Sequence, residues 1–140
     1  MAIEKKAAPI LAVENLKVRY GEAEALADVS LHILPGEIVS VVGANGAGKT
    51  TLIRTIAGMV KAAQGRVVFD GQDITGLDST GVCELGIAQV PEGRQIFPSL
   101  SVVENLRLGA TLRRAQADRK QNLSRVYETF PRLAERQKQL

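Results

Sequence analysis

Cysteine and long hydrophobic runs are almost absent from this chain of 140 residues. The one cysteine, Cys83, excludes an internal disulfide and a cysteine-based zinc site, which is typical of proteins in a reducing cytoplasm. The longest apolar stretches, residues 7–13 and 38–42, are far shorter than the ~20 residues that a membrane-spanning helix needs. We therefore expect no membrane span, and we interpret residues 7–13 as a first strand.

Composition is ordinary for a soluble globular domain, with 45% hydrophobic and 24% charged residues. We find no internal repeat and no low-complexity tract. The charge is unevenly distributed, because residues 101–140 contain nine basic and four acidic side chains, a local excess of +5. A nucleic acid, an anionic membrane surface or an acidic partner could use such a face. A solvated helix surface is the favoured interpretation, and we expect no nucleic-acid partner.

One stretch of the chain matches the phosphate-loop pattern G-x-x-x-x-G-K-[ST] without a mismatch. Glycines in such a loop let backbone N–H groups turn inward around a polyphosphate, and the lysine reaches the β- and γ-phosphates. The threonine hydroxyl can ligate Mg²⁺, and the helix-like residues that follow add the positive end of a helix dipole. The predicted phosphate-binding residues are Gly43, Ala44, Asn45, Gly46, Ala47, Gly48, Lys49, Thr50 and Thr51.

Short apolar segments dominate the first half of the chain and predict a run of strands leading into this loop. The predicted strands are residues 11–13, 16–20, 29–33 and 38–42. After the loop helix at about 50–58, the pattern predicts a strand at 67–69, a turn at Asp70-Gly71, a helix at 79–85 and a strand at 87–90.

Beyond Pro91 the pattern changes from strand to helix. Ser101 and Glu104 form a capping-box signature at a helix start. Farther along, apolar residues recur with the spacing of an amphipathic helix that Pro131 ends. These apolar residues are Leu123, Val126, Tyr127 and Phe130.

The loop and its flanking segments resemble the ATP-binding subunits of ABC transporters, and among them the group that serves branched-chain amino acid importers. The resemblance extends over nearly the whole chain. The segments that carry it are residues 34–39 before the loop, 65–71, 86–94, 96–100 and 104–106. It implies an α/β fold with a P-loop NTPase core, an N-terminal antiparallel β subdomain and the start of a helical subdomain, an incomplete ABC ATPase domain. The implied boundaries are 1–98 for the nucleotide-binding core and 99–140 for the helical part.

The resemblance also implies roles for two residues outside the loop. Tyr20 stands where the family carries an aromatic side chain that stacks on adenine. Glu92 stands where most members have a glutamine that touches Mg²⁺ and the attacking water, and the importer group is similar to this chain in having glutamate there. The expected cofactors are therefore ATP and Mg²⁺, with Thr50 and Glu92 as metal ligands. Residues 92–97 would transmit the nucleotide state to a membrane subunit.

Several motifs of the resembled family are not found in this sequence. The family carries a serine-glycine-glycine signature, an apolar run ending in Asp-Glu and a switch histidine after the helical part. Residues 67–70 imitate the apolar run, but Gly71 follows Asp70, and His32 precedes the loop. From these residues alone we expect nucleotide binding without turnover, since the acidic pair orients water in phosphoryl transfer. We also expect marginal stability or association unless further sequence completes the sheet.

The partners implied by the resemblance are a second ATP-binding subunit and transmembrane permease subunits. They imply a location at the inner face of the plasma membrane. Two alternatives stay open, a truncated non-catalytic nucleotide binder and another P-loop NTPase. Residues 73–76 match the D-x-x-G pattern of GTPases, but the Asn-Lys-x-Asp that reads guanine is missing.

Overall fold

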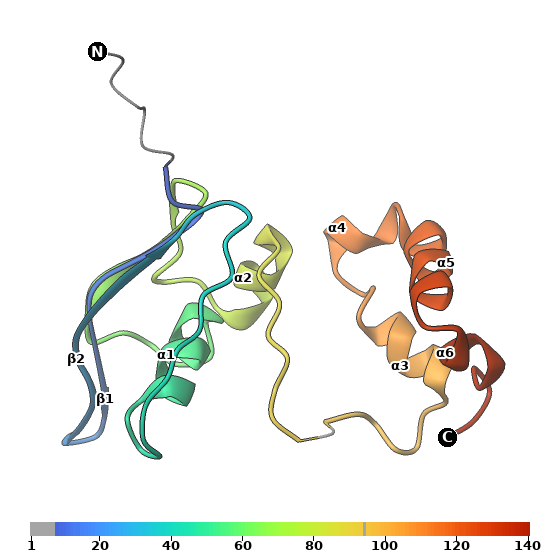
Figure 1. Cartoon of the computed structure of the whole chain (residues 1–140), viewed down its shortest axis with the longest axis horizontal. Helices are drawn as coiled ribbons and strands as arrows, with labels where there is room; N and C mark the ends of the chain where they lie inside the picture. The colour runs from blue at the N-terminus through green and yellow to red at the C-terminus, as the bar shows by residue number, and fades with distance from the viewer. Residues whose placement is uncertain (1–7, 94) are drawn as a thin grey trace, which may run out of the picture. The chain divides into compact units, whose positions relative to one another are not determined.

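The computed structural model describes residues 8–93 and 95–140. The chain divides into two compact units, Met1–Gln89 and Val90–Leu140 (Figure 1). The domain boundary predicted at residue 98 lies within the second unit. Two predicted segments, the strand beginning at Ala7 and the family-like stretch ending at Arg94, each include one residue outside the described ones.

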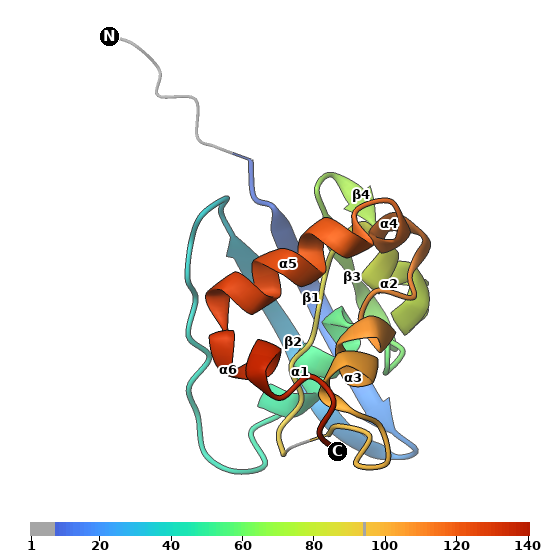
Figure 2. The ribbon, with the colours of Figure 1, turned by 90° about the vertical axis from the view of Figure 1, so that its right-hand side faces the viewer.

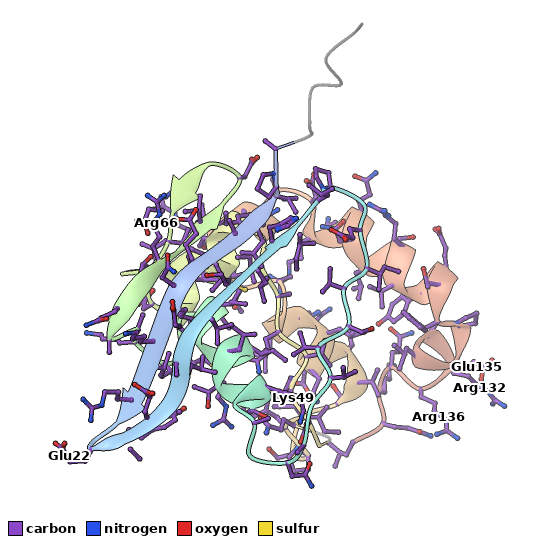
Figure 3. All side chains as sticks on the ribbon, turned by 60° about the vertical axis from the view of Figure 1, so that its left-hand side comes forward. Glu22, Lys49, Arg66, Arg132, Glu135 and Arg136 are labelled. Atoms are coloured by element: carbon purple, nitrogen blue, oxygen red, sulfur yellow. The ribbon has the colours of Figure 1, made fainter. Side chains whose placement is uncertain are left out.

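The first unit is built on a four-stranded antiparallel sheet with the order β2-β1-β3-β4. Its strands are β1 (Leu11–Tyr20), β2 (Ala23–Ile33), β3 (Gln64–Phe69) and β4 (Gln72–Asp73). The two long strands β1 and β2 form a hairpin (Figure 3), joined at Gly21-Glu22, and Tyr20 pairs with Ala23. The predicted turn at Asp70-Gly71 is confirmed as the connection between β3 and β4.

Strand β1 is continuous, and the prediction of two separate strands with a break between residues 13 and 16 is wrong. The pairing register shifts there instead, and Asn15 has a φ of 46°, so the strand contains an irregularity of the β-bulge type. The Asn15 N–H donates to Ser30 Oγ at 2.9 Å, which satisfies a backbone group that the irregular pairing leaves free. A local bulge of this kind interrupts the hydrophobic alternation without ending the strand.

Helices α1 (Lys49–Ile56) and α2 (Ser79–Leu85) confirm the two helices predicted in this unit. Leu52 of α1 and Val82 of α2 join the buried residues of the sheet in one hydrophobic cluster, so both helices pack on the same face of the sheet (Figure 1). The strand residues of the cluster are Leu11, Val13, Leu16, Val18, Leu26 and Val67.

Two predicted strands, at residues 38–42 and 87–90, are not formed. Ile38 is 96% exposed, Val42 89% and Val90 93%. The apolar pattern at both places is that of a parallel strand buried on both faces. A strand also needs a hydrogen-bonded neighbour, and among the described residues no strand pairs with either segment. The pattern therefore predicted the side-chain chemistry of these segments but not their pairing.

The second unit is helical, as predicted, with α3 (Val102–Leu108), α4 (Arg113–Gln116), α5 (Arg119–Thr129) and α6 (Pro131–Glu135) (Figure 2). In the predicted apolar stripe, Leu123, Val126 and Tyr127 of α5 are partly buried, while Phe130 follows the end of the helix and is 56% exposed. Pro131 occupies the first turn of α6, so the break expected at this proline is confirmed. Across the described residues, none of the helices is both long and apolar enough to span a membrane.

The predicted capping box at the start of α3 is confirmed. The Ser101 Oγ donates to Glu104 Oε2 at 2.5 Å, and the Ser101 N–H donates to the same oxygen at 2.8 Å. These two bonds, the hydroxyl first, hold the pKa of Glu104 below its usual value of 4.5. The carboxylate form of Glu104 therefore stabilises this helix start.

Acidification is expected to weaken the start of α3. The folded-state pKa of Glu104 is depressed, so its stabilisation is present above the unfolded-state pKa and is lost as the pH falls through the folded-state pKa. Carboxyl ¹³C chemical shifts of Glu104 should show a midpoint below 4.5, and the Ser101 amide shift should follow the same titration. Glu104→Gln keeps an acceptor but cannot ionise, so its Ser101 amide should not titrate. A Glu104 midpoint at or above 4.5 would contradict the capping interpretation.

Candidate phosphate-binding site

The predicted phosphate loop runs directly into helix α1, which begins at Lys49. Gly46 and Gly48 have φ values of +84° and +87°, a left-handed conformation that glycine adopts without a steric penalty. The Leu52 N–H donates to the Gly48 carbonyl at 2.9 Å, so Gly48 is the N-cap of the helix. The positive end of the α1 dipole therefore faces the loop, an arrangement that attracts anions.

Lys49 lies over the loop that precedes it (Figure 3). Its Nζ donates to the Gly43 and Ala44 carbonyl oxygens, each at 2.7 Å. Within the described residues no carboxylate pairs with Lys49. The ammonium charge is thus held at the loop by neutral acceptors and stays uncompensated, which is the electrostatic requirement for binding a polyphosphate.

Strand β2 presses against the end of the loop. A Cβ on Gly48 would lie 2.5 Å from Leu26 Cδ2 and 2.7 Å from the Ala25 carbonyl oxygen. At Gly46, by contrast, a Cβ would meet nothing within 4 Å. The loop is therefore packed against the sheet at Gly48 and open at Gly46, which leaves room for a ligand along its outer edge.

Tyr20, the predicted base-stacking residue, ends strand β1 and is 50% exposed. The turn that follows it is held by Arg19, whose Nη2 donates to the Glu22 carbonyl at 2.9 Å and lies 3.6 Å from Glu22 Oε2. The aromatic ring thus belongs to the same compact unit as the phosphate loop and is available to a ligand.

The predicted metal ligands, Thr50 and Glu92, belong to different units of the chain. Thr50 is exposed on the first turn of α1, while Glu92 is exposed and its carbonyl accepts from Gln95 Nε2 at 3.4 Å. The pairing of these two residues on one Mg²⁺ ion stays a prediction. No group of three His, Cys, Asp or Glu side chains suited to a metal ion occurs within residues 8–93 and 95–140.

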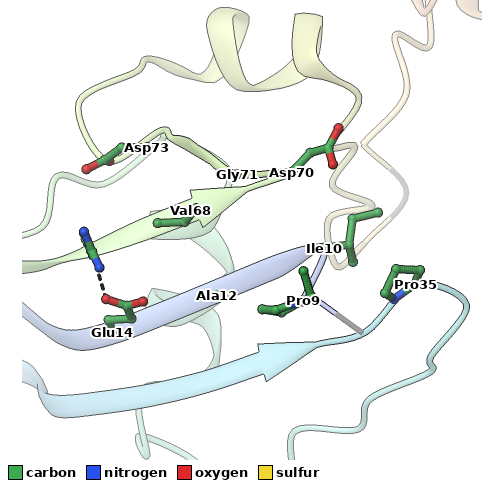
Figure 4. A pocket seen from close by; sticks show the side chains of 11 residues that line it. Pro9, Ile10, Ala12, Glu14, Pro35, Val68, Asp70, Gly71 and Asp73 are labelled. Atoms are coloured by element: carbon green, nitrogen blue, oxygen red, sulfur yellow. Dashed lines mark hydrogen bonds and ion pairs between the residues drawn. The ribbon is translucent and has the colours of Figure 1, made fainter. Parts of the chain in front are cut away.

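A cavity of about 660 Å³ lies on the sheet face opposite the hydrophobic cluster (Figure 4). Ala12 and Val68 pair across β1 and β3 in its lining, beside an ion pair in which Arg66 Nε donates to Glu14 Oε2 at 2.6 Å. This hydrogen bond raises the pKa of Arg66. No residue of the phosphate loop lines the cavity, so it is separate from the candidate site.

Sequence reasoning placed Asn105 in the family-like stretch 104–106 but missed its role in shaping the loop before α3. The Phe97 N–H donates to Asn105 Oδ1 at 2.9 Å. Asn105 Nδ2 donates to the carbonyls of Phe97, Leu100 and Ser101 at 3.0, 3.0 and 3.1 Å. An asparagine inside a helix is disfavoured unless its side chain bonds nearby backbone, and this was the signal available in the sequence.

Comparison with known proteins points to one family. A family model described as ABC transporter matches residues 26–140. The high-affinity branched-chain amino acid transport ATP-binding protein BraG of Pseudomonas aeruginosa is 42% identical, over 93% of this chain and 55% of that protein. The ribose import ATP-binding protein RbsA 2 of Streptomyces avermitilis is 40% identical, over 77% of this chain and 21% of its own length. The chain thus spans about half or less of the length of these relatives.

Solved structures agree with this result. A nucleotide-free ATP-binding cassette from an ABC transporter superposes with a TM-score of 0.79 at 29% identity, over 94% of this chain and 57% of the other. A dimeric bacterial ABC transporter cassette gives a TM-score of 0.64 at 30% identity, over 71% and 46%. The predicted fold class is therefore confirmed, with the described sheet and helices forming part of an ATP-binding cassette.

Proposed function

This chain belongs to the ABC transporter family of ATP-binding proteins, and from that premise we propose that its residues Gly43 to Thr51 bind the phosphates of ATP. The observation that carries the proposal is the position of Lys49. Its ammonium has no carboxylate partner among the described residues and lies beside an open glycine loop at a helix N-terminus. An anion with several oxygens would pair with the ammonium, fit the open loop and lie at the positive end of the helix dipole.

Tyr20 and Thr50 complete the proposed nucleotide site. The half-exposed Tyr20 ring supplies a stacking surface for adenine. The exposed Thr50 hydroxyl at the helix start suits an oxygen-preferring cation, and Mg²⁺ bound there would neutralise charge on the β- and γ-phosphates. A second oxygen ligand from Glu92 remains the prediction made from the sequence.

The role we propose for the whole protein is that of an energy-supplying subunit of an importer. BraG is named for high-affinity branched-chain amino acid transport, which supports the same substrate class here. A ribose import protein at nearly equal identity means that the substrate must be tested directly. We propose a second ATP-binding subunit, as in the dimeric cassette, and transmembrane permease partners that hold the protein at the inner face of the plasma membrane.

Calorimetric titration with ATP, GTP and inorganic tripolyphosphate tests the binding proposal. We expect ATP to bind more tightly than tripolyphosphate, because the base adds a stacking contact. Removal of Mg²⁺ with a chelator should lower ATP affinity by about tenfold or more, equal to about 1.4 kcal/mol or more. GTP binding as tight as ATP binding would show that the site does not select adenine, and no binding of any triphosphate at millimolar concentration would end the proposal.

A further inference from the structure

One buried side chain connects the hairpin that carries Tyr20 to the phosphate loop. Leu26 of β2 is 5% exposed, and its Cδ2 occupies the space that a Cβ on Gly48 would need, 2.5 Å from that position. The Leu26 side chain thus reaches the backbone of the loop where the loop becomes helix α1. Leu26 and Leu52 of α1 also belong to the same hydrophobic cluster. Strand β2 is therefore packed against both the loop and the helix that follows it.

Tyr20 is tied to Leu26 through the hairpin. Val18 pairs with Leu26 and Tyr20 pairs with Ala23 in the antiparallel register. The turn between the strands is braced by the contacts of Arg19 with Glu22. The register shifts after Val18, and pairing resumes at Arg19 with Glu24 and continues to the turn. A displacement of β2 relative to the loop is therefore passed to Tyr20 through these last pairs of the hairpin. The spacing between the ring and the phosphate loop therefore depends on the packing of Leu26 against Gly48.

We propose that Leu26 is a positioning residue that fixes the distance between the base-stacking ring of Tyr20 and the phosphate loop. The proposal rests on the proposed ATP-binding function. A ligand that binds at two subsites gains the full contribution of both only when their spacing is already set before binding. Leu26 fulfils this condition by filling the space beside Gly48, where the loop itself has no side chain.

A double-mutant cycle between Leu26 and Tyr20 tests the proposal. Leu26→Val removes the Cδ contact with Gly48 but suits a strand, and Leu26→Met keeps a side chain long enough to reach it. In the wild-type background, Tyr20→Ala should lower ATP affinity about twofold to tenfold. In the Leu26→Val background the same change should lower it less than twofold, and Leu26→Met should restore the wild-type value. Leu16→Val, a matched change at a fully buried leucine of β1, should leave the Tyr20 effect unchanged.

The affinity for inorganic tripolyphosphate measures binding at the phosphate loop alone. Leu26→Val should change its affinity less than twofold, because this probe has no base. An equal Tyr20 effect in both Leu26 backgrounds overturns the inference, and so does the absence of a Tyr20 effect in the wild type. A loss of tripolyphosphate binding as large as the loss of ATP binding also overturns it, because Leu26 would then shape the loop alone. If the wild type binds no ATP, the proposed function fails instead.

Discussion

Replacing Lys49 with alanine is expected to lower ATP affinity by about 10- to 100-fold and to leave the fold intact. Hydrogen bonds to charged groups contribute about 1.5–3 kcal/mol each, which corresponds to this range. Among the described residues, the Lys49 ammonium donates to the Gly43 and Ala44 carbonyls of its own loop, and Lys49 is not part of the hydrophobic cluster. Calorimetric titration with Mg-ATP measures the affinity, and thermal unfolding followed by circular dichroism checks the fold.

Lys61→Ala is the matched control for this experiment. It removes the same charge from an exposed position of the same unit, five residues after the end of α1. Any loss of affinity that both variants share reflects the lower net charge of the protein, while the excess in Lys49→Ala reflects the site. An affinity of Lys49→Ala equal to that of Lys61→Ala would refute the assignment of the phosphate-binding residues.

Gly48→Ala is expected to lower the free energy of unfolding by about 2–5 kcal/mol and to disrupt the phosphate loop. A left-handed conformation costs a non-glycine residue about 1–2 kcal/mol. Overpacking adds about 1–3 kcal/mol, because the new Cβ meets Leu26 Cδ2 and the Ala25 carbonyl at 2.5 and 2.7 Å. One of these neighbours is backbone of a paired strand, so relief by a rotamer change alone is not available. Urea denaturation measures the loss as a shift of the midpoint.

Gly46→Ala separates the two causes. Gly46 has nearly the same φ, +84° against +87°, but its Cβ would have nothing within 4 Å. It should therefore lose only the conformational part, about 1–2 kcal/mol. The difference between the two variants gives the cost of the contact between β2 and the loop. Equal destabilisation of both would mean that β2 does not press on the loop.

The parts of this fold that sequence predicted well are those governed by local chemistry. The glycines of the phosphate loop, the Ser101–Glu104 capping box and the break at Pro131 each depend on groups within a few residues of one another. Such groups impose the same backbone conformation whatever surrounds them. The beginning of α1 and the end of α5 could therefore be predicted from the local sequence.

The failures occurred where structure depends on distant partners. Residues 38–42 have strand chemistry, but a strand forms only with a neighbour to share its hydrogen bonds, and no pattern within the segment supplies one. The contact of Leu26 with Gly48 joins residues far apart in sequence, so only the tertiary fold determines it. The irregularity at Asn15 was missed for a related reason, because its N–H is satisfied by Ser30 on another strand.

The bonds of Asn105 have a consequence for how freely the chain can vary. Within the part of the chain that the structure describes, its amide bonds to main-chain atoms of Phe97, Leu100 and Ser101 and to no side chain. The path of the loop before α3 is thus specified by one amide, while the side chains along it are left free to differ. Exposed side chains such as Ile96 and Phe97 can therefore be exchanged without loss of the hydrogen bonds that hold this loop.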